Sequence, residues 1–529
     1  MYITISERRE KMRILINKIT VAVICLMIMT SFAGCTIVKK SDIPEKNNNS
    51  NTLDTQKIIE NSITVGVVEL DTYNPLTTNS PTMKNMLGFM FEPLFLVDEN
   101  LNAENVLASD YVVSPDGKNI RITIKNNVMW HDNSLFTSND VVYTIKCLLN
   151  QENNYSYLAN YVESVTAIDN YTVSINFKRP VPDPVLLMSF PIIKNGSFTD
   201  DFIPIGTGPF YISYDKLRAF GNYYGNKPQL EYIEIMSVPD NEKFNSLFNA
   251  SVIDIADSDM INMSEYMPRS NAKIHDYYSN EMVYVGFNCN SDVFSKSEAR
   301  KSVSAIIDRR DIVSHIYFSR AKAVNYPVNP KSSFYPSNGG NLLKDDGTAE
   351  KTMKDAGWKK DKNGTYFYAD NVGMTYFSVN ILANSDDIQC MKTASAISES
   401  MTEIGMKNTL ITCPTQEFND RILYGNYDMY IDKITLLQNN DLSPLLSSGN
   451  KLNFSDEETD ILLMQTATVS NPEESKAIYD KLLSRIKEIA PIAPVCFLKE
   501  SLITSAKLKS GVIPYMPLTV ARTENWSVQ

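Results

Sequence analysis

One cysteine stands where its thiol can be acylated. Cys35 follows Ser31-Phe32-Ala33-Gly34, which in turn follows an apolar run from Ile19 to Met29. That run suits a cleaved leader and is shorter than the roughly 18 residues that a membrane span needs. We therefore expect residues 1–34 to be removed, with translation starting at Met1 or Met12. The ending at Cys35 resembles a bacterial lipobox, and this resemblance implies that Cys35 becomes an N-terminus that carries diacylglycerol and palmitate. The alternative is an ordinary cleaved leader in which Cys35 is incidental.

The rest of the chain carries no recognisable catalytic or metal-binding set. It contains no G-x-S-x-G, H-E-x-x-H, G-x-x-x-x-G-K-[ST] or G-x-G-x-x-G motif. Its three histidines, His131, His275 and His315, lie far apart in the sequence, which argues against an imidazole metal cluster. We predict no catalytic residue, no cofactor, no metal ion and no enzymatic activity.

Five further cysteines occur singly and without C-x-x-C spacing: Cys147, Cys289, Cys390, Cys413 and Cys496. Cysteines in this pattern are typically small buried apolar residues, with a single disulfide left as an alternative.

The charge of the chain excludes one class of partner. The formal net charge is −12, and residues 1–34 hold five of the basic side chains but only two acidic ones, so the mature chain is more acidic still. Nucleic-acid binding needs a concentrated basic surface, so we expect no nucleic-acid partner. The length exceeds what one hydrophobic core usually serves, which predicts at least two lobes.

The first half of the chain predicts a polar tether followed by strands and a capped helix. Residues 35–58 are polar and rich in Asn, and a β-branched run begins at Ile63. Later, Ile120, Ile122 and Ile124 alternate with polar residues, as in a strand with one buried face. The further predicted elements are a turn at 114–117, a helix after the capping box of Thr137 and Asp140, and strands at 162–168 and 172–177.

The second half alternates helices and strands, which indicates an α/β lobe. The predicted elements are helices at 297–318, 349–356, up to 404 and 415–423, and strands at 374–381, 407–412 and 427–434.

Several motifs together resemble the signature of family 5 extracellular solute-binding proteins, the receptors of dipeptide, oligopeptide and nickel ABC importers. In chain order they are Ser114-Pro115-Asp116-Gly117, Val128 to Asn133, Asp140-Val141-Val142-Tyr143, Gly206-Thr207-Gly208-Pro209-Phe210, Tyr284 to Asn288, Glu298 to Arg309 and Ala349 to Trp358. These motifs are turns, caps and core faces, so they identify the scaffold and say little about the ligand.

The resemblance implies a two-lobed α/β fold of the periplasmic-binding-protein type, with a cleft between the lobes and a small extra α/β domain. The implied division is a signal peptide at 1–34, a tether at 35–58, lobe I from 59–93, 204–284 and 501–529, the extra domain at 94–203 and lobe II at 285–500.

The resemblance weakens where peptide-binding members place an aspartate for the ligand's α-amino group, in a W-x-x-D-Y-x-[DE]-P stretch. Ungapped placement puts Ile434 at the tryptophan and Leu437 at the aspartate, so that the anchor is missing. With a short insertion, Asp441 and Pro444 replace it. A buried ammonium group needs a carboxylate partner, so the two placements predict different ligands.

Tyr73 and Asn74 after the first strand, and Gln438, Asn439 and Asp441 in the altered stretch, are the predicted ligand contacts. Aromatic and amide groups suit an uncharged or capped ligand. The alternative for each of these residues is an exposed loop position that contacts no ligand.

By resemblance, the expected function is a monomeric, lipid-anchored receptor on the outer face of the cytoplasmic membrane. It captures an oligopeptide-like solute between two lobes and delivers it to an ABC permease. The alternatives are a sensor or receptor for a non-peptide solute or metal chelate, and a surface enzyme or chaperone on the same scaffold.

Overall fold

The computed structural model describes residues 61–528 apart from 200–201, 258–271, 372 and 470, and every structural statement below concerns those residues. The predicted leader, Cys35 and the tether lie outside them. Among the described residues, no helix combines the length and the apolar character that crossing a membrane requires. The predicted domain limits stay a prediction.

Two four-stranded sheets form in the region before residue 240. The first has the order β1 (Ser62–Val67), β10 (Tyr232–Ser237), β9 (Lys216–Ala219), β8 (Phe210–Ser213), with β1 and β10 parallel. The second is the antiparallel sheet β4 (Ala108–Val113), β5 (Asn119–Ile124), β7 (Thr172–Phe177), β6 (Val162–Asp169), packed by α3 (Ser138–Asn150) and α4 (Leu158–Tyr161). One apolar core contains residues of both sheets.

Shorter elements complete this part of the chain. They are α2 (Pro81–Leu87), the pair β2 (Phe95–Val97) and β3 (Ala103–Asn105), the 3-10 helix η1 (Pro184–Met188), α5 (Asn241–Asn249), the pair β21 (Leu508–Ser510) and β22 (Ser527–Val528), and the 3-10 helix η2 (Thr523–Asn525).

A seven-stranded mixed sheet organises the second half. Its order is β11 (Ile255–Asp257), β20 (Ile492–Thr504), β12 (Lys273–Phe287), β19 (Met429–Thr435), β17 (Ser378–Asn384), β18 (Lys407–Cys413), with β13 (Ala321–Ala323) on β20. The helices of this half are α6 (Ser297–Ala305), α7 (Arg309–His315), α8 (Asp346–Asp355), α9 (Ile388–Glu403), α10 (Thr415–Leu423), α11 (Ser443–Leu446), α12 (Glu457–Thr466) and α13 (Pro472–Ile489). A separate three-stranded sheet comprises β14 (Lys359–Lys360), β15 (Tyr366–Ala369) and β16 (Met374–Tyr376).

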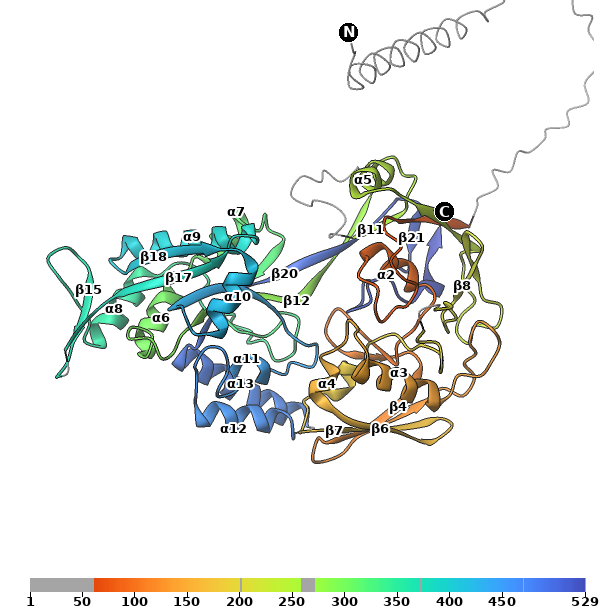
Figure 1. Cartoon of the computed structure of the whole chain (residues 1–529), viewed down its shortest axis with the longest axis horizontal. Coiled ribbons are helices and arrows are strands. Elements are labelled where there is room, and N and C mark those ends of the chain that lie inside the picture. Colours follow the sequence, from red (N-terminus) through yellow and green to blue (C-terminus); the bar gives the residue numbers. More distant parts are fainter. Residues whose placement is uncertain (1–60, 200–201, 258–271, 372, 470, 529) are drawn as a thin grey trace, which may run out of the picture. The chain divides into compact units, whose positions relative to one another are not determined.

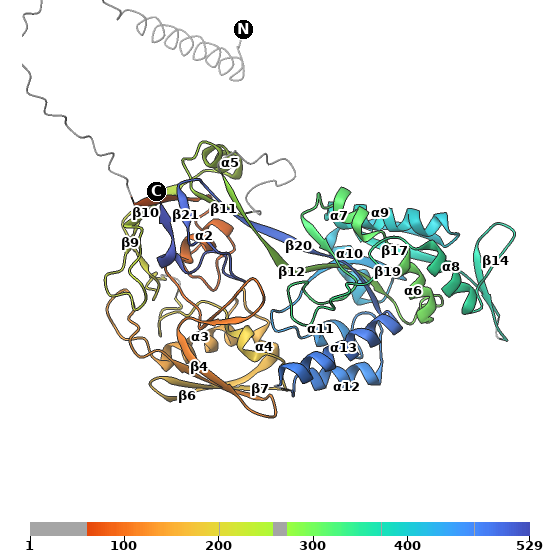
Figure 2. The ribbon, with the colours of Figure 1, turned by 180° about the vertical axis from the view of Figure 1, so that it is seen from behind.

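β12 and β20 are the segments that join the two lobes. They are 15 and 13 residues long, pair antiparallel, and run together between the lobes in both views (Figure 1, Figure 2). At one end β20 also pairs with β11, and at the other β12 pairs with β19. The pairing register of β12 with β20 shifts between Tyr278 and Met282, which marks an irregularity in the middle of the crossing.

Most of the predicted elements are confirmed. Ile120, Ile122 and Ile124 are buried and the intervening residues are exposed, as the alternation predicts. Asp140 Oδ2 accepts the Thr137 N–H at 2.8 Å in the capping box at the start of α3. The described cysteines are free thiols, and all but Cys289 are buried.

Two predicted elements are wrong in extent. The helix predicted over 297–318 is two helices, because the chain leaves the helical path before Asp308 and Asp308 caps α7 through the Asp311 N–H at 2.9 Å. The strand predicted over 374–381 is β16 and β17 in different sheets. Phe377 between them is fully buried against Trp358 and Phe294, so it turns the chain into a core.

Two of the family-like motifs meet at His131. Its Nδ1 accepts the Gly206 N–H at 3.1 Å and its Nε2 donates to Gly208 O at 3.0 Å, which defines a neutral imidazole with the proton on Nε2. Burial lowers the pKa of His131 to about 4. A Cβ atom on Gly206 would come within 1.8 Å of Met90 O, so only glycine permits this approach.

Glu92 is a buried carboxylate beside the C-terminal segment. It accepts hydrogen bonds from Thr207 Oγ1 at 3.0 Å, Tyr223 Oη at 2.8 Å and Tyr224 Oη at 3.1 Å. Burial, with a smaller contribution from the negative charge of Glu524, raises the pKa of Glu92 to about 7 against the hydrogen bonds that lower it.

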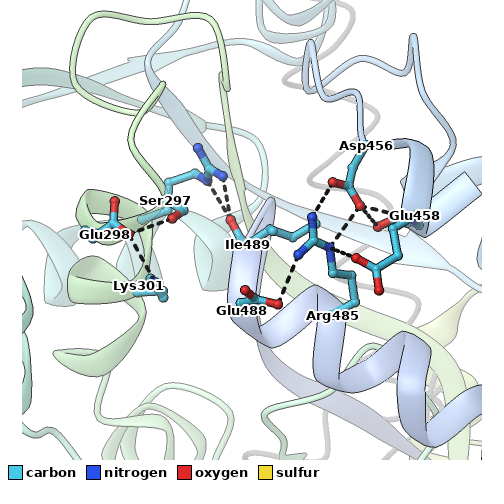
Figure 3. Close-up of polar contacts among 10 residues, drawn as sticks. Ser297, Glu298, Lys301, Asp456, Glu458, Arg485, Glu488 and Ile489 are labelled. Atoms are coloured by element: carbon cyan, nitrogen blue, oxygen red, sulfur yellow. Dashed lines mark hydrogen bonds and ion pairs between the residues drawn. The ribbon is translucent and has the colours of Figure 1, made fainter.

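Arg485 joins α13 to the start of α12 (Figure 3). Its guanidinium binds both oxygens of Asp456, at 2.6 and 3.1 Å, and also contacts Glu458 and Glu488. Asp456 is the N-cap of α12 and accepts the Thr459 N–H at 2.9 Å. The hydrogen bonds from Arg485 lower the pKa of Asp456 to about 2.

We expect Asp456→Ala to lower the free energy of unfolding by about 1–2 kcal/mol, because it removes a helix cap and a bidentate ion pair. Urea titration followed by circular dichroism measures the change. Asp480→Ala, which removes a single exposed ion pair on α13, is the control and should stay within about 0.5 kcal/mol of the parent. Equal effects of the two substitutions would contradict the assignment.

We expect the stability of the protein to fall as the pH rises through 7, in part because of Glu92. The pKa of Glu92 is about 7 in the folded protein, against an ordinary value of 4.5. Between pH 4.5 and pH 7 the folded protein therefore binds more protons than the unfolded chain, and the stabilisation that this provides is lost as the pH rises to about 7. Glu92→Gln should therefore reduce the loss of thermal stability between pH 5 and pH 8. The exposed Glu69→Gln is the control, and a Glu92→Gln profile parallel to that of the parent would refute the prediction.

Candidate functional site

A cavity of about 530 Å³ lies beside the crossing strands, within the range of roughly 300–1,000 Å³ typical of small-ligand sites. Residues from six groups along the chain line it. They are Pro75 and Thr78 before α2, Pro81, Lys84, Asn85, Leu87, Gly88 and Phe91 on and after α2, Asn154, Tyr155 and Pro191 near α4 and η1, Asp257, Tyr277, Ser279, Asn280, Glu281 and Glu500 on and beside the crossing strands, Thr435 and Gln438 at the end of β19, and 515–520.

The helix α2 presents a cation to this cavity. Ser80 caps α2 by accepting the Met83 N–H at 3.4 Å, and Pro81 occupies the first turn, where no backbone donor is needed. Asp71 fixes the preceding loop through Thr78 Oγ1 at 2.6 Å and the Asn79 N–H at 2.7 Å. On the helix so placed, Lys84 is exposed and forms no ion pair with any residue that the structure describes.

The register break in β12 turns polar groups toward the cavity. Ser279 and Asn280 are buried at this break, and Asn280 Oδ1 accepts a hydrogen bond from Asn329 at 2.6 Å. Asn280 O also accepts the Leu436 N–H at 2.9 Å, which ties the break to the chain that follows β19. The irregular backbone is therefore held from both sides while its side chains line the cavity.

Carboxylates lie on the wall formed by the crossing strands. Glu500 accepts a hydrogen bond from Tyr277 Oη at 2.7 Å, and Asp257 accepts one from Asn85 Nδ2 at 2.9 Å. Glu281 Oε1 lies 4.0 Å from Lys433 Nζ. The cavity thus has a basic group on α2 and acidic groups on the strands, an arrangement that suits a ligand carrying both charges.

The predicted ligand contacts lie differently with respect to this cavity. Gln438 lines it, whereas Tyr73 and Asn74 do not, although Pro75 and Thr78 of the same loop do. Tyr73 packs half-buried against the core. Asn74 Oδ1 accepts the Leu76 N–H at 3.0 Å and shapes the loop.

Asn439 and Asp441 are buried away from the cavity wall. Asn439 Nδ2 donates to Pro182 O at 3.0 Å. Asp441 Oδ2 accepts from Arg179 at 2.8 Å and from Tyr161 Oη at 3.0 Å. Its role as an amino-group anchor stays a prediction, and in the structure its carboxylate is engaged by protein donors.

Sequence reasoning missed Lys84, Glu281 and Glu500 as lining residues. Lys84 follows a recognisable Ser-Pro helix start, and Glu281 and Glu500 lie in β-rich segments, but nothing in their spacing shows that they face one space. Among the described residues, no group of three or more His, Cys, Asp or Glu side chains is placed to hold a metal ion.

Comparisons with known proteins agree on the scaffold. Oligopeptide-binding protein AppA of Bacillus subtilis (strain 168) is 22% identical over 454 residues, which span 79% of this chain and 82% of AppA. Among solved structures, HbpA2 from Haemophilus parasuis aligns with a TM-score of 0.74 at 18% identity, over 88% of this chain and 100% of that chain. NikZ from Campylobacter jejuni, solved in complex with Ni(L-His), aligns with a TM-score of 0.63 at 21% identity, over 88% of this chain and 99% of that chain.

The fold expected from the resemblance, a two-lobed α/β binding protein, is confirmed by these structures. A family profile described as "Bacterial extracellular solute-binding proteins, family 5 Middle" matches residues 102–453, which is more than half of the chain. This protein therefore belongs to the bacterial extracellular solute-binding proteins of family 5.

Proposed function

We propose that this protein is a lipid-anchored receptor that captures a small zwitterionic, peptide-like solute outside the cell and delivers it to an ABC permease. The observation that carries the ligand class is the cavity between the lobes, with an ammonium group on one wall and carboxylates on another. A peptide carries a free carboxylate and a free ammonium group, so each end finds an opposite charge.

The ligand chemistry follows from the placement of the charges. Lys84 forms no ion pair with any residue that the structure describes, and Glu281 and Glu500, which also contact protein groups, contribute negative charge to the lining of the same cavity. The β12 register break contributes Ser279 and Asn280 to the cavity lining, so polar groups of an irregular strand lie beside the charged ones. AppA is named for oligopeptides and NikZ was solved with a nickel–histidine complex, so relatives of this scaffold differ in ligand.

Native mass spectrometry of the protein lacking residues 1–35, purified under mild conditions, tests the ligand class directly. A ladder of short peptide masses released on denaturation supports the proposal. A single homogeneous mass of a metal chelate or other non-peptide would refute the peptide assignment.

We expect Lys84→Ala to weaken binding of a short peptide about 10–100-fold, since a hydrogen bond to a charged group contributes roughly 1.5–3 kcal/mol. Isothermal titration calorimetry with trialanine measures the affinity. Lys118→Ala, at an exposed turn away from the cavity, is the matched control and should bind as the parent does. An unchanged affinity for Lys84→Ala would remove Lys84 from the site.

Anchoring is tested at Cys35. We expect Cys35→Ala to lose incorporation of a palmitate analogue and to move the protein from the membrane fraction to the soluble fraction, because a peripheral protein without acyl chains has no stable hold on the bilayer. Cys413→Ala is the control and should remain labelled and membrane-bound. Persistent labelling of Cys35→Ala would contradict the anchor.

A further inference from the structure

The segment between β19 and α11, residues 436–442, reaches from lobe II onto the region that carries α4 and β7. In both views α4 and β7 lie beside α11, α12 and α13 (Figure 1, Figure 2). Leu437 packs against the core that contains β5 and β7. Asn439 is fully buried and donates to Pro182 O at 3.0 Å. We call residues 436–442 the clasp segment.

Asp441 makes the strongest of these contacts. Its Oδ2 accepts hydrogen bonds from the Arg179 guanidinium at 2.8 Å and from Tyr161 Oη at 3.0 Å, while the Arg179 guanidinium lies 5.0 Å from the centre of the Tyr161 ring. The side chain of Asp441 is 2% exposed, and that of Arg179 is 41% exposed. A charge so buried is stabilised only while its partners stay in place.

The clasp segment is firmly attached to its own lobe. Asp441 Oδ1 accepts the Ser443 N–H at 2.9 Å at the start of α11, and Tyr479 Oη on α13 donates to Asn440 O at 3.0 Å. A movement of lobe II about the crossing strands therefore carries Asp441 with it and separates it from Arg179 and Tyr161.

A second contact lies close by. The turn at Gly117 meets the end of α12 so closely that a Cβ atom there would lie 2.4 Å from Ala467 O. This contact is between backbones, which shows that the two surfaces fit together in this state.

We propose that Asp441 is a closure latch: its bonds to Arg179 and Tyr161 hold lobe II against the α4–β7 region and set the closed population of the ligand-free protein. Gln438 of the same clasp segment lines the ligand cavity, so latch closure and cavity closure are one movement. The latch is inferred from the contacts of Asp441 with Arg179 and Tyr161, and only its effect on ligand affinity rests on the proposed function. The apparent affinity of a ligand that binds the closed state is proportional to the fraction of the protein that is closed.

Small-angle X-ray scattering of the ligand-free protein, prepared by denaturation, dialysis and refolding, tests the latch without any ligand. We expect Asp441→Asn and Arg179→Ala each to increase the radius of gyration, and the double variant to add no further increase, since both substitutions break the same interaction. Arg179 is partly exposed, so Arg179→Ala reports on the latch even where a change at the buried Asp441 impairs folding.

Glu350→Gln is the matched control, because it breaks the exposed ion pair with Lys360 within lobe II and should leave the radius unchanged. Radii of both latch variants equal to that of the parent would overturn the proposal.

A binding measurement tests the latch and the proposed function separately. With trialanine as the probe, the latch predicts an apparent dissociation constant raised about tenfold in Arg179→Ala. If the latch variants have larger radii of gyration but the parent does not bind trialanine, the latch is supported and the peptide ligand is refuted. Unchanged radii with normal trialanine binding would refute the latch alone.

Discussion

The backbone ladder between β12 and β20 is the constraint on which the rest of the structure depends. Two long antiparallel strands satisfy each other's hydrogen bonds along the passage between the lobes, so the crossing is a defined structural element and not a loose linker. Each lobe then adds its own partner to this pair, β11 at one end and β19 at the other. A register break at 279–281 interrupts the ladder midway.

The same break creates the chemistry of the cavity. The irregular stretch of β12 and the adjoining strand β20 contribute Ser279, Asn280, Glu281 and Glu500 to its lining. α2 also lines this cavity, and its start is specified independently, by the Ser80 cap and Pro81. Opposite charges from separately specified elements thus line one space, which is the basis of the proposed ligand class.

The clasp segment shows how a buried charge can couple the lobes. The side chain of Asp441 is almost completely buried in this state, and its Oδ2 is stabilised by donors that belong to another part of the chain. Such an interaction is specific to one arrangement of the lobes. Exposed ion pairs elsewhere, such as that of Glu350 with Lys360, lack this property because water replaces the lost partner.

The sequence by itself determined the elements and the scaffold: the alternation at Ile120–Ile124, the capping box at Thr137 and the family-like motifs depend on neighbours within a few residues. It predicted one continuous helix over 297–318, where the structure has two. The break between them depends on a cap and on burial of Arg309 against distant carbonyls such as Pro494 O. It found Gln438 but not Lys84, Glu281 or Glu500. Only the tertiary structure decided which residues share the cavity and that Asp441 binds Arg179. The residues that meet at these two places are far apart in the sequence and come together only when the chain crosses between the lobes.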